Sequence, residues 1–157
     1  LGMVSIVDNV QSAVRSLQPL IDEKGHTLEV DLPAKLPLVY ADGNRVVQVV
    51  TNLLTNAIKY TANGGQLAVR AAPEGGFVKI EVQDNGCGIS PADQPDIFTQ
   101  FFRSEDADVR QEPGWGLGLH VAQQLVVLMG GEIGFSSTHG AGSTFWFTLP
   151  TQSKPGE

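Results

Sequence analysis

Residues 42–61 carry two opposite faces within one helix-length segment, and this feature constrains the fold more than any other. The segment DGNRVVQVVTNLLTNAIKYT has no helix breaker after Gly43, and Asp42 is a favourable N-cap. At about 100° per residue, one side is apolar: Val46, Val47, Val50, Leu53, Leu54, Ala57 and Ile58. The opposite stripe is polar: Arg45, Gln48, Asn52, Asn56 and Lys59. The pattern predicts one amphipathic helix.

The polar stripe of this helix is unusual because its centre holds Asn52 and Asn56, one turn apart. Surface stripes are normally rich in Lys and Glu, and Asn is a mediocre helix former. Carboxamide oxygens can bind a Mg²⁺ ion that already carries phosphate oxygens, and Lys59 is placed to meet phosphate charge. A solvated amphipathic helix explains the same stripe, so the segment alone leaves both interpretations open.

Length and composition indicate one globular domain. The chain has 157 residues, of which 41% are hydrophobic and 17% charged, as is typical of soluble domains with a proper core. We expect the domain to span residues 1–150, followed by a polar tail at 151–157. A net charge of −7 argues against a nucleic-acid partner, since phosphate backbones select basic surfaces. The single cysteine, Cys87, excludes an internal disulfide and suits a reducing cytoplasm.

The remaining chain alternates predicted helices and strands. Apolar residues at helical spacing predict helices over 4–24, ending at Gly25, and over 117–129. Because the helical pattern already begins in the first residues, we expect the chain to be a piece of a longer protein. Short or alternating apolar segments predict strands over 27–32, 38–40, 66–72, 77–83, 132–137 and 143–149. This order predicts an α+β two-layer sandwich, with three helices on one face of a mixed, mostly antiparallel sheet.

The sequence contains neither a membrane span nor a signal peptide. We therefore expect no direct membrane contact by this domain. No His/Cys spacing typical of a metal site occurs either.

Two glycine-containing segments are suited to holding a ligand. Asp84 ends a predicted strand and precedes Gly86 and Gly88, which let a flat ring approach the backbone. Asn85–Gly86 is also the usual signal for a tight hairpin turn, but no strand follows it. Residues 114–118 form a glycine-rich loop that leads into a helix N-terminus, where N–H groups and the helix dipole favour phosphate. This loop matches neither the dinucleotide fingerprint nor a P-loop.

Together these segments resemble the conserved boxes of sensor histidine kinases. NLLTNAIKYT is similar to their N box, DNGCGI to the first glycine box, IFTQFFR to the phenylalanine box and GWGLGL to the second glycine box. The ending GGEIGFSSTHGAGSTFWFTLP resembles their closing strands, so the similarity runs from about residue 4 to 150. It implies the catalytic, ATP-binding domain of a two-component sensor histidine kinase. The implied fold is the Bergerat-type α/β sandwich shared with gyrase, MutL and heat-shock chaperone ATPases.

The resemblance implies a role for each matching residue. Asp84 is expected to accept a hydrogen bond from the adenine amino group, supported by Thr144, and Asn56 to bind Mg²⁺. The other expected contacts with ATP come from Asn52, Lys59, Tyr60, Gly86, Gly88, Ile89, Phe98, Gly116, Leu117, Gly118 and Leu119. Arg103 is expected to meet phosphate charge, as is Lys59. Phe98, Phe101 and Phe102 are expected to anchor a lid, residues 103–113, that closes over ATP.

Asn52 also predicts the kind of reaction. Related hydrolases and serine kinases usually carry Glu at this position, a base that can activate water or a hydroxyl. Asn cannot take that proton, whereas a neutral imidazole is already nucleophilic at neutral pH. We therefore expect phosphoryl transfer to histidine, with Asn52, Lys59 and Arg103 acting by positioning and charge neutralisation.

The acceptor histidine is expected outside this chain. Family members carry it on a dimerising helical hairpin, followed by an acidic residue and soon by Arg and Pro. None of His26, His120 and His139 has this context. We expect the hairpin upstream of Leu1, and a response regulator receiver domain as the further partner.

Two residues depart from the family pattern or stand out within it. Trp115 occupies a position between two glycines where small residues are usual. Its indole could fold outward, pack under the lid or obstruct the phosphates, and we expect it to pack against the lid. Cys87 is expected to be a small filler in the glycine box.

A nucleotide-binding regulatory module with little transfer activity is the main alternative function. An ATP-hydrolysing conformational machine is disfavoured by Asn52 and by the lack of a second, transducing domain.

Overall fold

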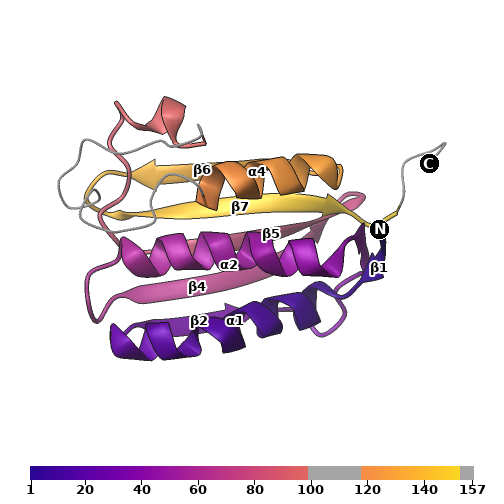
Figure 1. Cartoon of the computed structure of the whole chain (residues 1–157), viewed down its shortest axis with the longest axis horizontal. Coiled ribbons are helices and arrows are strands. Elements are labelled where there is room, and N and C mark those ends of the chain that lie inside the picture. Colours follow the sequence, from indigo (N-terminus) through magenta and orange to yellow (C-terminus); the bar gives the residue numbers. More distant parts are fainter. Residues whose placement is uncertain (99–117, 153–157) are drawn as a thin grey trace.

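The computed structural model describes residues 1–98 and 118–152, whose elements are labelled in Figure 1. The helices are α1 (Ile6–Glu23), α2 (Gly43–Lys59) and α4 (Gly118–Leu128), with a short 3-10 helix η1 (Gln94–Asp96). The strands are β1 (Gly2–Val4), β2 (Thr27–Asp31), β3 (Val39–Ala41), β4 (Gln66–Glu74), β5 (Phe77–Asp84), β6 (Ile133–Thr138) and β7 (Gly142–Pro150). Every predicted helix and strand is present, with ends that differ by at most two residues.

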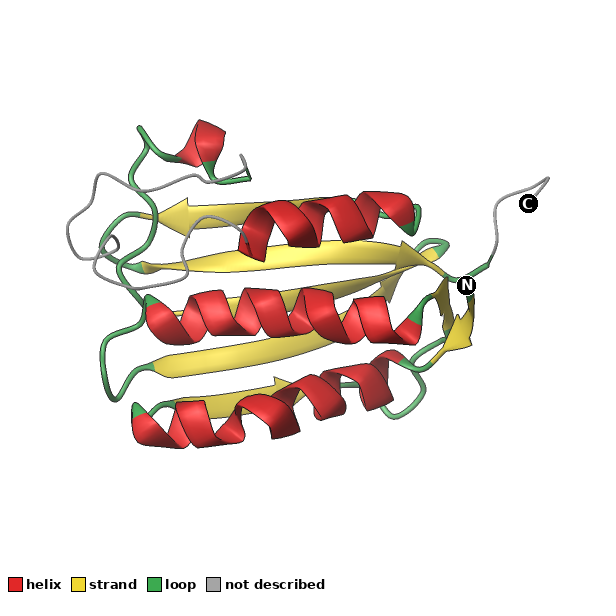
Figure 2. Cartoon of the chain, viewed as in Figure 1, coloured by secondary structure: helices red, strands yellow, loops and turns green. Residues whose placement is uncertain are grey.

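The architecture is the predicted two-layer α+β sandwich. The main sheet has five strands in the order β2-β4-β5-β7-β6, and the three helices lie side by side on one of its faces (Figure 2). Only β2 and β4 pair in parallel, while the other neighbours in this sheet are antiparallel. The sheet is therefore mixed and mostly antiparallel, as the order of elements predicted.

Helix α2 lies in the middle of the helical layer (Figure 1) and has the predicted two faces. The Asp42 side chain caps it by accepting a hydrogen bond from the Asn44 N–H at 3.0 Å. Its buried residues are Val46, Val49, Val50, Leu53, Leu54, Ala57 and Ile58. Val49 is therefore an addition to the predicted apolar face, and Val47 is only partly buried.

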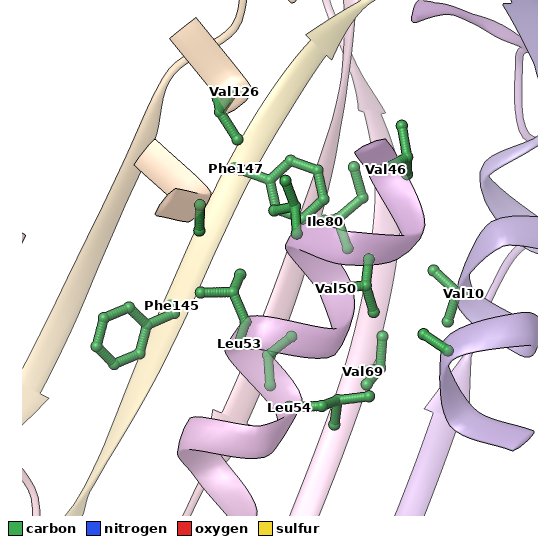
Figure 3. Packing of buried hydrophobic residues seen from close by; sticks show 14 of the residues in the cluster. Val10, Val46, Val50, Leu53, Leu54, Val69, Ile80, Val126, Phe145 and Phe147 are labelled. Atoms are coloured by element: carbon green, nitrogen blue, oxygen red, sulfur yellow. The ribbon is translucent and has the colours of Figure 1, made fainter. Parts of the chain in front are cut away.

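The core fills the space between α2 and the sheet (Figure 3). Val50 and Leu53 of α2 are fully buried, as are Ile80 of β5 and Phe147 of β7. Full burial of an apolar side chain of this kind contributes about 1.5–3 kcal/mol. The core thereby fixes the position of α2, and with it the position of the two asparagines on its other side.

The first residues do not continue the helix, which corrects the prediction for residues 4–24. Residues 2–4 form β1, which pairs with β3 through Gly2↔Ala41 and Val4↔Val39. Helix α1 begins afterwards because Ser5 caps it, its hydroxyl accepting from the Asp8 N–H at 3.2 Å. The helical periodicity at the N-terminus thus did not reveal a strand whose partner lies far along the chain.

The strand β2 is less buried than its alternating pattern suggests. Among the strands that the structure describes, it lies at the edge of the sheet and pairs with β4 alone. Val30 is 41% exposed for that reason, although Leu28 packs partly against the core. None of the described helices is both long and apolar enough to cross a bilayer.

Candidate functional site

Three polar residues, Ser137, Ser143 and Asp84, occupy adjacent positions on neighbouring strands at the end of the apolar core. Ser137 of β6 pairs with Ser143 of β7, and Ser143 pairs with Asp84 of β5. The next row inward is apolar, with Phe145 paired to Val82. Since alternate residues of a strand share one face, this polar row lies on the helix-covered side of the sheet. The change from apolar to polar marks the edge of the core and the start of the candidate site.

Asp84 is a buried carboxylate held by backbone donors. Asp84 is only 7% exposed, and its side chain accepts a hydrogen bond from the Gly86 N–H at 2.9 Å. Burial raises the pKa of the Asp84 carboxyl from 3.8 to about 6, while backbone hydrogen bonds from Gly86 and Ser143 oppose that rise. The carboxylate is therefore mostly ionised at neutral pH and acts only as a hydrogen-bond acceptor.

The register of β5 and β7 corrects the expectation for Thr144. Thr144 pairs with Gln83, so both side chains point to the sheet face opposite to that of Asp84. Ser143 is the residue directly across from Asp84, and it is 7% exposed. A shift of one residue in a strand moves a side chain to the other face, which is why the motif alone placed the wrong residue beside the carboxylate.

The loop after Asp84 runs through a narrow space between two backbones. A Cβ atom on Gly86 would lie 2.2 Å from the Tyr60 carbonyl oxygen, and one on Gly88 would lie 2.2 Å from the Thr138 carbonyl oxygen. Gly88 also has a φ of 70°, which favours glycine. These glycines are therefore required by the packing of the protein itself. The expectation that they make room for a base remains a prediction.

Ile89 is held at both of its backbone groups. Its N–H donates to the Ser137 hydroxyl at 2.8 Å, and its carbonyl accepts from the Gln94 side-chain amide at 3.0 Å. The preceding residues are tied as well, because the Cys87 N–H donates to the Tyr60 carbonyl at 3.2 Å. The loop from Asp84 to Ile89 is thus a fixed wall rather than a hairpin turn.

On α2, the two asparagines differ in their surroundings. Asn52 donates its side-chain amide to the Gly118 carbonyl at 3.1 Å and so ties α2 to the first residue of α4. The Asn56 side chain makes no hydrogen bond within residues 1–98 and 118–152. Its carboxamide is therefore available to a ligand.

Residues that follow α1 cap the C-terminal end of α2, which carries Lys59. The Lys24 ammonium donates to the carbonyls of Ile58 and Lys59, at 2.9 and 3.2 Å. His26 accepts the Gly65 N–H at Nδ1 and donates from Nε2 to the Ile58 carbonyl, each at 3.1 Å. Buried His26 therefore has a structural role, and it contributes to the position of Lys59 and Tyr60.

Phe98 and Leu119 pack into the interior beside the site. The Phe98 ring meets Phe135 and Phe145 edge-on, with centroids 6.0 and 6.3 Å apart. Its carbonyl accepts a hydrogen bond from His120 Nδ1 at 3.2 Å, so His120 too has a structural contact. The Leu119 side chain is 6% exposed and belongs to the core, which leaves only its backbone for the contact with phosphate that we expected.

Comparison with known proteins identifies the family. Residues 41–153 match the family described as Histidine kinase-, DNA gyrase B-, and HSP90-like ATPase. This stretch is more than half of the chain. The chain belongs to this family.

Two relatives of this ATPase-family domain are named as signalling kinases. The chain is 39% identical over 145 residues to the adaptive-response sensory kinase SasA of Synechococcus sp. (strain JA-2-3B'a(2-13)), and the match covers 89% of this chain and 37% of that protein. It is 42% identical over 139 residues to the signal transduction histidine-protein kinase BarA of Escherichia coli (strain K12), covering 85% of this chain and 15% of that protein. The chain thus spans only a minor part of these relatives.

Solved structures agree with this membership. Full-length ShkA in complex with AMPPNP superimposes with a TM-score of 0.81 and 32% identity, covering 99% of this chain and 32% of that one. The mycobacterial sensor histidine kinase MprB gives a TM-score of 0.80 and 25% identity, covering 94% and 95%. The resemblance to sensor histidine kinase catalytic domains, and the fold it implied, are confirmed.

Several expected site residues of this ATPase-family domain lie outside the described residues. They are Phe101, Phe102, Arg103, Gly116 and Leu117, together with Trp115 and the lid at 103–113. The structure adds Ser137 and Ser143, which the motifs did not single out. The period-two pattern of Ser143, Phe145, Phe147 and Leu149 could have placed Ser143 on the buried face from sequence alone.

Proposed function

We propose that this domain binds Mg-ATP and transfers the γ-phosphoryl group to a histidine outside this chain. The observation that carries the proposal is the buried Asp84 carboxylate at the end of the sheet, with Ser143 beside it. A fixed acceptor selects a ligand edge that bears a donor, such as the amino group of adenine. Guanine carries a carbonyl oxygen at that position and would leave the carboxylate facing a lone pair. Ser143, in place of Thr144, would support this contact.

The donor chemistry of the described residues fits a magnesium–nucleotide complex. Mg²⁺ prefers oxygen ligands and usually keeps waters and substrate phosphates, so it needs only one or two protein ligands. Asn56 offers its carboxamide oxygen, and Asn52, whose amide nitrogen is bound to Gly118, offers its own oxygen nearby on the same stripe. Within the described residues no group of three His, Cys, Asp or Glu side chains gathers to hold a metal. When bound, the ion would neutralise phosphate charge.

The side chains on α2 support transfer rather than hydrolysis. Asn52 has no basic group to activate water, and an imidazole acceptor needs none. In the proposed reaction the imidazole nitrogen forms a bond to the γ-phosphorus while the bond to the ADP oxygen breaks. Lys59 and Arg103 would counter the charge on the transferred group, so catalysis rests on positioning and electrostatics.

The proposed partners follow from the same reaction. The acceptor histidine would lie on a dimerisation and histidine-phosphotransfer domain, and the phosphoryl group would then pass to a response regulator receiver domain. The relatives named above as a sensory kinase and a signal transduction kinase support this setting. We place the domain in the cytoplasm, where ATP is available.

A phosphotransfer assay tests the proposal against both alternatives. The protein is mixed with its upstream helical hairpin and γ-labelled ATP, with and without Mg²⁺. Acid-labile, alkali-stable label on the hairpin would support a histidine kinase. Binding of ATP without label would support a regulatory module instead, and rapid release of phosphate would support an ATPase.

A further inference from the structure

The hydroxyl of Ser137 connects three segments that meet at the end of the sheet. It lies 2.8 Å from the Ile89 N–H of the loop after β5. It also lies 3.2 Å from the Gly142 carbonyl and 2.8 Å from the Ser143 hydroxyl, both in β7. A serine hydroxyl has one proton and two lone pairs. Ser137 therefore accepts from Ile89 and has a single proton to give to the β7 side.

This arrangement restricts the hydroxyl of Ser143. Ser143 stands directly across from Asp84 and is as buried as the carboxylate, each being 7% exposed. Its hydroxyl is 2.8 Å from that of Ser137, and this contact limits how it can rotate. Whatever Ser143 offers to a ligand beside Asp84 is thus set partly by Ser137.

The same hydroxyl also helps to place the loop that forms the wall of the site. The Cys87 carbonyl accepts the Gly140 N–H at 2.6 Å, which joins the loop to the β6–β7 turn by backbone alone. The Ser137 side chain adds a second hydrogen bond to this loop, two residues further along at the Ile89 N–H. Loss of its hydroxyl would leave the Ile89 N–H, which is part-buried, without this partner.

We propose that Ser137 is a positioning residue for purine selection, because it orients the Ser143 hydroxyl and fixes the Ile89 end of the Asp84 loop. The inference rests on the proposed binding of adenine beside Asp84. A hydroxyl free to rotate can donate to the carbonyl of guanine or accept from the amino group of adenine. A hydroxyl held by Ser137 adapts less, so it sharpens the preference for one base.

The test compares Ser137→Ala with Ser136→Ala by titration with ADP and with GDP. Ser136 is a matched control because it is the preceding serine of β6, is exposed and faces the other side of the sheet. We expect Ser137→Ala to reduce the ratio of ADP to GDP affinity about fivefold or more, with Ser136→Ala unchanged. An unchanged ratio in Ser137→Ala overturns the inference.

A double-mutant cycle tests whether Ser137 acts through Ser143. If it does, Ser137→Ala should change the base preference far less in a Ser143→Ala background. Equal effects in both backgrounds contradict the inference. Faster amide exchange at Ile89 in the nucleotide-free Ser137→Ala protein is the matching structural readout. If the alanine variant does not fold, the Ser137→Cys variant is used in its place.

The outcomes separate this inference from the proposed function. If the unmodified protein binds ADP and prefers it to GDP, but Ser137→Ala keeps that preference, only the role of Ser137 is wrong. If the unmodified protein binds neither nucleotide, the proposed function and the inference both fall.

Discussion

Asp84 lies directly across from Ser143, and the neighbouring Thr144 belongs to the other face of the sheet. The buried carboxylate and the buried hydroxyl therefore form one polar row at the end of the core. The candidate site is built from that row, from the loop that follows Asp84, and from the polar stripe of α2.

Ser143→Ala should weaken ATP binding, whereas Thr144→Ala should leave it nearly unchanged. The first change removes a hydroxyl from the face that carries Asp84, and the second alters the opposite face. We expect a loss of about tenfold, or about 1.4 kcal/mol, for Ser143→Ala. Calorimetric titration with Mg-ATP measures both. A larger loss for Thr144→Ala would contradict the register.

Asp84→Asn should stabilise the nucleotide-free protein at pH 8. Burial raises the pKa of this carboxyl to about 6, so its ionised form is less favourable in the folded state than in the unfolded chain. The energetic cost is present above the folded pKa and disappears as pH falls below the ordinary value near 3.8. We expect the variant to gain about 1–3 kcal/mol at pH 8 and less than about 1 kcal/mol at pH 4. Urea unfolding at both pH values measures this.

The same substitution should weaken ATP binding, since an amide is a poorer acceptor than a carboxylate. The ratio of wild-type to Asp84→Asn affinity should fall as the pH drops below about 6, where Asp84 takes up a proton. Using the ratio cancels the titration of the nucleotide phosphates, which both proteins share. A gain in stability with unchanged affinity would mean that the carboxylate does not contact the ligand.

Asn56→Ala should remove the magnesium-dependent part of ATP affinity. Within the described residues this carboxamide has no hydrogen-bond partner to lose, so the fold should be intact. Gln48→Ala is the matched control, because Gln48 is an exposed amide two turns earlier on the same stripe. Titration with ATP in Mg²⁺ and in EDTA should give equal affinities for Asn56→Ala alone. Retained magnesium dependence would remove Asn56 as a ligand.

Asn52→Asp should destabilise the fold by about 1–3 kcal/mol, because a carboxylate cannot donate to the Gly118 carbonyl that Asn52 contacts at 3.1 Å. The loss should shrink at low pH, where the protonated acid can donate again. Gln48→Glu places a similar charge on the exposed part of the stripe and should change the free energy of unfolding by less than about 0.5 kcal/mol. Chemical denaturation of both variants provides the measurement. Equal effects would show that charge matters and the contact does not.

Local patterns in the sequence predicted the elements well. The 3.6-residue periodicity of α2 and the alternation of β5 and β7 record which face of each element is buried, because burial requires apolar side chains at regular spacing. The motifs also brought Asp84, Asn52 and Asn56 to attention as candidate site residues. Their spacing along one helix and at one strand end is a local property that the chain carries without its fold.

Other features depend on contacts between distant parts of the chain. The pairing of β1 with β3 involves residues separated by a whole helix, and the bond from Asn52 to Gly118 joins residues 66 positions apart. Likewise, the edge position of β2 explains the exposure of Val30, although its own sequence alternates like that of a half-buried strand.

The sequence by itself therefore determined the helices, every strand except β1, the α+β class and the family to which the chain belongs. Only the tertiary structure decided that Ser143 stands beside Asp84, that Ser137 holds Ser143 and Ile89, and that Asn52 ties α2 to α4. The physical reason is that periodicity records the burial of a face. Strand register and side-chain hydrogen bonds between elements arise only when those faces pack together.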